Sequence, residues 1–279
     1  MTSDGIPAVA VSVDRPADPC RALDWAAREA MVRDAPLLIV TVSTGVVGSR
    51  RDKAHLLLQQ CAQRTERSHP GLRVTWEVMD AEARRTFERR GQDVQLLVVG
   101  ARSTHRLNER LFGSTAVHTA AAAVCPVVVV PENPQASWPA RGQGPIVLGL
   151  DEETDHARAA MAFAFEAAVR EDAELRVVHA WQRSLTGADG ATALMMAAEQ
   201  DMRLHRTLAP WRAHYPEVDL QAEAVYGGTR RYLQEMSQQA GLVVVGRRGR
   251  PTGPLARLHS VGQSVLRRAR CPVAVIPAA

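Results

Sequence analysis

Short apolar runs alternate along the chain with segments whose apolar residues recur every three or four positions. The first run, residues 8–13, is followed by such a segment, and a second run covers residues 37–42. Apolar side chains at helical spacing line one face of a helix, whereas short runs rich in valine and leucine are typical of strands. Asp18 and Pro19 predict a capped start for the first helix. Strands alternating with helices predict parallel pairing, in a sheet covered on both faces.

The same order of elements occurs twice. Residues 96–100 (LLVVG) and 124–131 (VCPVVVVP) match residues 242–246 (LVVVG) and 270–277 (RCPVAVIP), and the glycine and the cysteine are equally far apart in both halves. Such equal spacing argues for duplication of one unit. Each half is therefore predicted to follow the order β-α-β-α-β-α-β-α-β. The other strands are predicted at residues 72–78 and 127–130 in the first half, and at 146–150, 175–181, 218–226 and 273–276 in the second.

The segment that joins the halves has the composition of a linker. Residues 132–144 combine prolines and glycines with a lone tryptophan, which is typical of a connection between compact units. We predict a first domain over residues 1–134, a linker over 135–144 and a second domain over 145–279.

Composition narrows the classes of function. The chain is 46% hydrophobic and 23% charged, and its 34 basic and 30 acidic residues give a net charge of +4. This weak positive charge does not predict a nucleic-acid partner. The four cysteines lie far apart without a C-x-x-C pair, so we expect reduced thiols rather than a zinc site or disulfides. We see neither a secretory signal nor an apolar run long enough to span a bilayer, so we expect no membrane association and a cytoplasmic location.

Polar and glycine residues gather where the first and fourth strands of each half are predicted to end. Ligands of open parallel sheets bind at the carboxyl ends of strands where the chain order reverses. Glycine lets the backbone approach a phosphate, and a helix N-terminus offers unpaired amides to an anion. Taken alone, a glycine after a strand is equally well explained as a turn. The residues at these strand ends are Asp14 and Asp151, with loops that run from Gly100 through Ser103 to Gly113 and Ser114, and from Gly246 through Gly249 to His259 and Ser260.

The combination is more specific than its parts. The pattern G-x-x-G-x9-G-[ST] after an apolar strand, with Cys-Pro and another apolar strand closing the unit, resembles the ATP-binding universal stress proteins in both halves. The resemblance implies two tandem α/β, Rossmann-like (adenine nucleotide alpha hydrolase-like) domains, each with a parallel sheet in the order 3-2-1-4-5 and helices on both faces. It implies ATP, with or without Mg²⁺, across the ends of strands 1 and 4. By the same resemblance, Asp14 and Asp151 face the adenine or ribose, Val40 and Val178 contact the adenine through their backbones, and the phosphate loops comprise Gly100, Ser103, Gly113 and Ser114 in the first domain and Gly246, Gly249, His259 and Ser260 in the second.

The two loops depart from the family pattern in different ways. Ser103 replaces the second glycine but keeps a hydroxyl that can donate to phosphate. His259 replaces the third glycine and adds a bulky side chain where the backbone must come close. Glu152 and Glu153 would repel a triphosphate, although arginines of the second loop, Arg247 among them, would offset that repulsion. We therefore expect two diverged sites.

Two functions of different classes remain open. The first is an ATP-binding regulatory protein of the stress response without a dedicated catalytic activity. The second is a nucleotide-free scaffold whose relic loops accompany dimerisation and protein contacts. An enzyme is not favoured, because neither glycine loop is followed by a Walker lysine and we find no supported nucleophile-histidine arrangement; His179 we interpret as a hydrogen-bonded strand histidine. The resemblance also implies that the last strands, residues 127–130 and 273–276, pair the two domains within the chain, and it leaves a homodimer and a protein partner open.

Overall fold

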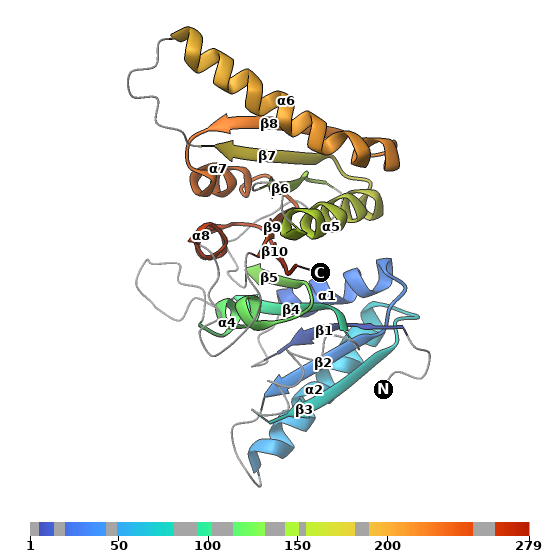
Figure 1. Cartoon of the computed structure of the whole chain (residues 1–279). Coiled ribbons are helices and arrows are strands. Elements are labelled where there is room, and N and C mark those ends of the chain that lie inside the picture. Colours follow the sequence, from blue (N-terminus) through green and yellow to red (C-terminus); the bar gives the residue numbers. More distant parts are fainter. Residues whose placement is uncertain are drawn as a thin grey trace. The chain divides into compact units, whose positions relative to one another are not determined.

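The computed structural model describes residues 6–13, 20–42, 49–80, 94–101, 114–131, 143–150, 155–181, 190–247 and 260–278. These residues form two compact units (Figure 1). The described residues up to Pro131 belong to the first unit, and those from Gln143 onward belong to the second.

The described strands of the first unit form a parallel sheet in the order β3-β2-β1-β4-β5. This order confirms the predicted 3-2-1-4-5 arrangement. Long runs of valine and leucine are buried in it because helices cover both faces. The strands are β1 (Ala8–Ser12), β2 (Leu37–Val42), β3 (Val74–Met79), β4 (Val94–Ala101) and β5 (Val127–Pro131).

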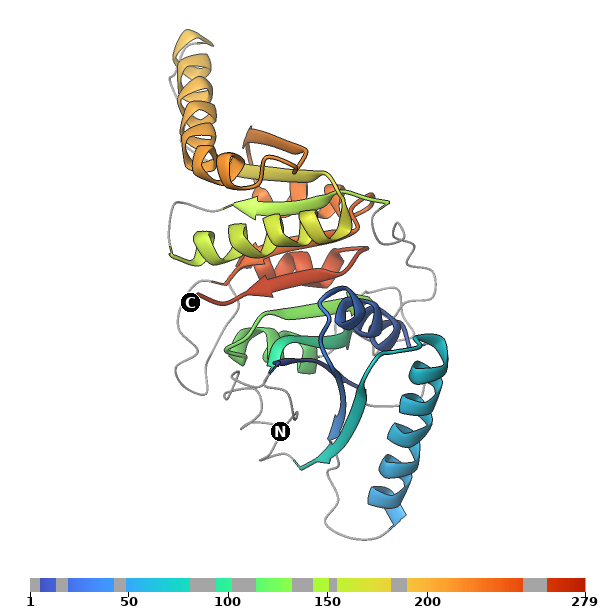
Figure 2. The same ribbon diagram turned by 90° about the vertical axis from the view of Figure 1, so that its right-hand side faces the viewer.

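Helices α1 (Arg21–Val32) and α2 (Ser49–Ser68) cover one face of this sheet, and α4 (Ser114–Ala122) lies on the other (Figure 2). Right-handed crossovers produce this division, because the chain first winds outward from β1 to β3 and then returns to β4 and β5. The predicted cap at Asp18 is wrong. Cys20 is the N-cap, with an extended backbone (φ −88°, ψ 94°) and no side-chain cap hydrogen bond, and the helix begins at Arg21.

The second unit repeats this architecture over its described residues. Its strands lie in the order β8-β7-β6-β9-β10, and each neighbouring pair is parallel. This is the order of the first unit, with β6 in the place of β1. The strands are β6 (Ile146–Leu150), β7 (Leu175–Trp181), β8 (Leu220–Tyr226), β9 (Leu242–Gly246) and β10 (Val273–Ile276).

The helices of the second unit also divide between two faces (Figure 1). Helices α5 (Asp155–Glu171) and α6 (Gly190–His214) lie on one face, and α7 (Thr229–Met236) and α8 (Ser260–Arg268) lie together on the other. Leu233 of α7 packs directly over Gly149 of β6, where a Cβ atom would come within 2.7 Å of Leu233 Cδ1. The glycine therefore lets α7 approach the sheet closely. No helix in the described part of the chain is both long and apolar enough to cross a membrane.

Candidate functional site

The chain order of the first unit reverses at β1, whose carboxyl end lies between those of β2 and β4. Ser12 pairs with Val40 of β2 and with Val99 of β4. The chain leaves β1 toward β2 and later returns to β4 on the other side, so the connections diverge at this edge and leave room for a ligand. Gly100 follows Val99 at the same edge, in register with Val130 of β5.

The helices that follow the two glycine loops begin where the sequence predicts. Helix α4 starts at Ser114 and α8 starts at Ser260. Each connects two parallel strands and runs antiparallel to them, so its N-terminus faces the carboxyl edge of its sheet. Neither helix has an acidic residue in its first turn. The unpaired amides and the positive end of each helix dipole are therefore not offset by a carboxylate of the helix itself.

Val40 and Val178 lie in corresponding places beside the first strand of their units. Val40 pairs with Ser12, and Val178 pairs with Gly149. Both side chains are buried, so a ligand at the edge would meet their backbone rather than their side chains. The carbonyl of Val40 already accepts a hydrogen bond from the amide of Val13, at 2.8 Å. A further donor would use the second lone pair of that oxygen.

The structure locates half of the predicted site residues. It brings Val40, Gly100 and the start of α4 at Ser114 to the edge of the first sheet, and Val178, Gly246 and the start of α8 at Ser260 to the same edge of the second. The predicted residues that lie outside the described ranges are Asp14, Ser103, Gly113, Asp151, Gly249 and His259.

A buried cation distinguishes the second edge from the first. Arg247 follows Gly246 directly, is only 3% exposed, and donates its backbone amide to the carbonyl of Ile276 at 2.7 Å. The corresponding residue after Gly100 is Ala101, which is also buried. A guanidinium held away from water favours an anion more strongly than one in solvent. In the sequence Arg247 looks like the other arginines of its loop. Its burial follows from its place directly after the strand, which only the structure shows.

His179 is a hydrogen-bonded strand residue, as interpreted from the sequence. Its Nδ1 lies 3.2 Å from the carbonyl oxygen of Leu150, the last residue of β6. A carbonyl can only accept, so Nδ1 carries the proton of the neutral ring and Nε2 is left as an acceptor. The arrangement offers a fixed polar atom near the strand end.

The cysteines behave as structural thiols. None of the four forms a disulfide, and Cys20, Cys125 and Cys271 are buried. Burial raises the pKa of the Cys271 thiol to about 12, so this residue stays protonated at neutral pH. Within the described ranges, no group of three histidine, cysteine, aspartate or glutamate side chains is placed to hold a metal ion.

Comparisons with known proteins agree with the duplicated fold. The model of the universal stress protein family matches residues 7–131 and again residues 144–277. Universal stress protein Rv2623 of Mycobacterium tuberculosis is 32% identical over 275 residues, which cover 91% of each chain. A universal stress protein of Mycolicibacterium smegmatis is 31% identical over 291 residues, or 96% of each chain. A solved universal stress protein from Archaeoglobus fulgidus superposes with a TM-score of 0.71 at 16% identity, covering 98% of both chains, and thus shares the fold.

Proposed function

The chain belongs to the universal stress protein family, and we propose that it is a regulatory protein that binds adenine nucleotide, ATP above all, without a dedicated catalytic activity. One observation carries this proposal. In each unit a strand with a glycine at its carboxyl end, Gly100 next to last in β4 and Gly246 last in β9, lies beside the first strand at the point of chain reversal. The next helix begins at a serine without an acidic residue in its first turn. Such an edge suits a phosphate group.

We assign the parts of the nucleotide to separate places along this edge. We assign the phosphates to the loops after Gly100 and Gly246 and to the first turns of α4 and α8. We assign the adenine to the backbone beside Val40 and Val178, where β2 and β7 adjoin the first strands. The aspartates that follow those first strands, and the remaining loop residues named from the sequence, stay predicted contacts. We assign Mg²⁺ no protein ligand, so any such ion would arrive with the phosphates.

The two sites are expected to differ in affinity. Arg247 adds a buried positive charge to the second site, where the first site has the neutral Ala101. The second site also carries His259 in place of a glycine, whereas the first keeps Gly113 ahead of its helix. Arg247 therefore adds an attractive charge to the second site, where Glu152 and Glu153 oppose it, and backbone freedom favours the first site.

A nucleotide-free scaffold is the second candidate. The substitutions Ser103 and His259 in the phosphate loops support it. In that case the function would lie in pairing of the two units through β5 and β10, in a homodimer, and in contacts with a protein partner. This candidate predicts that ATP leaves the stability of the chain unchanged.

Thermal unfolding with and without ATP tests the proposal. A ligand present at ten times its Kd stabilises the native state by about 1.4 kcal/mol. For a unit of roughly 135 residues this corresponds to a rise in Tm of roughly 5 °C. The informative variants are Ser114→Asp and Ser260→Asp. A carboxylate in the first turn stabilises a helix by about 0.3–1 kcal/mol but repels a phosphate.

Each aspartate variant should therefore keep its Tm without ATP and lose the ATP-dependent rise at its own site. Ser114→Asn and Ser260→Asn are the matched neutral controls, which should retain the rise. Comparing the single variants identifies which unit binds more tightly. The proposal is wrong if millimolar ATP fails to stabilise the wild-type chain, or if the double aspartate variant responds to ATP as the wild type does.

A further inference from the structure

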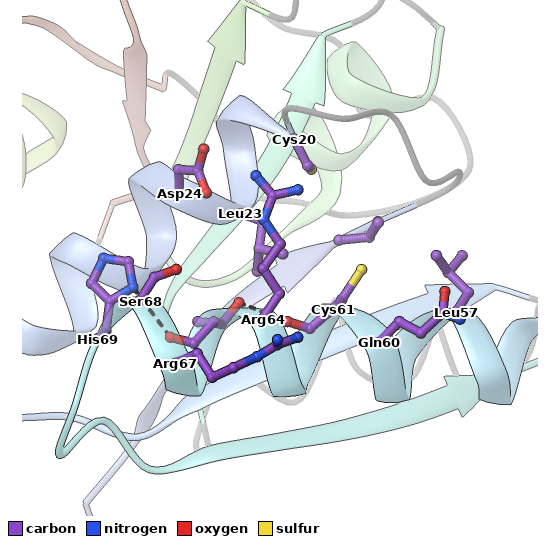
Figure 3. A pocket seen from close by; sticks show the side chains of 12 residues that line it. Cys20, Leu23, Asp24, Leu57, Gln60, Cys61, Arg64, Arg67, Ser68 and His69 are labelled. Carbon is purple, nitrogen blue, oxygen red and sulfur yellow. Dashed lines mark hydrogen bonds between the residues drawn. The ribbon is translucent and has the colours of Figure 1, made fainter.

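A cavity of about 360 Å³ lies between α1 and α2 of the first unit (Figure 3). We call it the α1/α2 cavity. Its floor is apolar, since it is formed by buried Val13 after β1, by Cys20 at the N-cap of α1 and by Leu23 of α1. Its volume is within the range of small-molecule sites, which is about 300–1,000 Å³.

The mouth of the α1/α2 cavity is polar and largely cationic. Arg64 and Arg67 of α2 line it and are exposed, and the half-buried ring of His69 lies at the end of the same helix. Figure 3 shows Arg64 pointing from α2 toward α1. Asp24 of α1 is the acidic side chain among the lining residues. The balance of charge at the mouth favours an anion.

Matching hydrogen bonds align the long helices of the two units. The amide of His69 donates to Thr65 at 2.9 Å after α2, and the amide of Tyr215 donates to Trp211 at 2.9 Å after α6. The residues just before β3 and β8 correspond as well. The amide of Leu37 donates to the carbonyl of Arg73 in the first unit, and the amide of Leu175 donates to the carbonyl of Asp219 in the second. Thr65 therefore corresponds to Trp211, and His69 corresponds to Tyr215.

The first helices align by the same kind of evidence. The amide of Ala35 donates to Ala30 after α1, and the amide of Ala173 donates to Ala168 after α5. Counting back three residues from Ala30 and Ala168 places Ala27 of α1 opposite Phe165 of α5.

The second unit fills this region with aromatic rings. Phe165 is fully buried and stacks on Trp211, with centroids 5.5 Å apart and an interplanar angle of 20°. It also stacks on Tyr215, with centroids 5.3 Å apart and an interplanar angle of 24°. The first unit has Ala27, Thr65 and His69 at the corresponding positions.

The α1/α2 cavity thus reaches two of the three positions at which the second unit packs its rings; the third, Ala27, is fully buried and is not part of the lining. Thr65 and His69 line the cavity directly. A helical side chain leans toward the N-terminus of its helix, so a ring at position 27 would extend toward Leu23, which lines the floor. The cavity therefore distinguishes the first unit from the second, and guanidinium groups lie at its mouth.

We propose that the first unit binds a small organic anion with an aromatic ring in the α1/α2 cavity. The ring occupies the apolar floor, in the place that the second unit fills with its own aromatic side chains. The carboxylate, sulfonate or phosphate of the ligand meets Arg64 and Arg67 at the mouth. This site lies between two helices over one face of the sheet. Its floor reaches the nucleotide edge at Val13, whose amide donates to the carbonyl of Val40, but its arginines belong to α2 and not to the phosphate loop.

The test uses anilinonaphthalene sulfonate, a fluorescent aromatic sulfonate, on the whole chain. The folded wild type should bind it saturably, with enhanced and blue-shifted emission, and bound dye should slow alkylation of Cys61 by a maleimide, because that thiol lines the cavity. The double variant Arg64→Gln, Arg67→Gln should weaken binding at least about tenfold, since charge-assisted contacts are lost. Arg51→Gln, an exposed charge on α2 away from the cavity lining, is the matched control and should bind like the wild type.

Thr65→Trp places the corresponding residue of the second unit in the cavity and should abolish both binding and the protection of Cys61. Far-UV circular dichroism checks its folding, and the arginine variant, altered only on the surface, tests the proposal even if this one misfolds. The proposal is overturned if the folded wild type does not bind the dye, if binding leaves Cys61 unprotected, or if the arginine variant binds with wild-type affinity.

Discussion

Removal of the Phe165 ring tests how strongly the aromatic stack stabilises the second unit. Phe165 is fully buried and stacks on Trp211 and Tyr215, which joins α5 to the end of α6. Replacing a buried phenylalanine by alanine costs about 3–5 kcal/mol, because apolar contacts are lost and a cavity remains. For a unit of roughly 135 residues this predicts a fall in Tm of about 10–18 °C.

Phe165→Leu is the matched variant, because it keeps an apolar side chain but loses both ring contacts. Each aromatic pair contributes about 0.5–1.5 kcal/mol beyond buried area, so this variant should fall between the wild type and Phe165→Ala. Hydrogen exchange read by mass spectrometry should show lost protection in peptides of α5 and α6, while peptides of α1 and α2 keep theirs. A loss below about 1 kcal/mol for Phe165→Ala would show that the aromatic stack does not hold α5 to α6, since buried large-to-small changes rarely cost so little.

Further predictions concern packing and thiol reactivity. Gly149→Val places a side chain against buried Leu233, whose Cδ1 lies 2.7 Å from the ideal Cβ position, and should lower the free energy of unfolding in urea by about 1–3 kcal/mol. Cys271, whose pKa burial raises to about 12, should stay unmodified by iodoacetamide in the native chain at mildly alkaline pH. Burial also raises the pKa of Cys61, but this thiol is only half-buried, so it should be the first to be alkylated, as quantified by peptide mass spectrometry.

Much of the fold could be predicted from the sequence, because buried parallel strands appear as uninterrupted apolar runs. The second strands of both halves are found at the predicted residues. The sequence predicts third strands that begin at residues 72 and 218. In the structure they begin two residues later, at Val74 and Leu220. The amide of Leu72 bonds to His69 and that of Val218 bonds to Tyr215, so both residues belong to the turn after a helix. An apolar residue in a turn cannot be told from the start of a strand by its hydrophobicity.

The candidate sites were predictable to different degrees. Glycines after apolar strands and serines at helix starts have fixed spacing in the sequence, so the sheet edge at which Gly100, Gly246 and the two helix starts lie could be predicted. The burial of Arg247 could not, because neighbouring arginines look identical in the sequence. The α1/α2 cavity was missed for another reason. It is lined by Thr65 and His69, and only the folded units show that aromatic residues, Trp211 and Tyr215, occupy the corresponding places in the second copy.

Native mass spectrometry of the whole chain in millimolar ATP tests nucleotide binding most directly. We expect a folded wild-type chain that carries one or two ATP molecules. The double variant Ser114→Asp, Ser260→Asp should have the same charge-state distribution and carry no ATP, while the double asparagine control binds as the wild type does. A wild-type spectrum without an ATP adduct, or a double aspartate variant with wild-type occupancy, would contradict the assignment of the nucleotide to these two sheet edges.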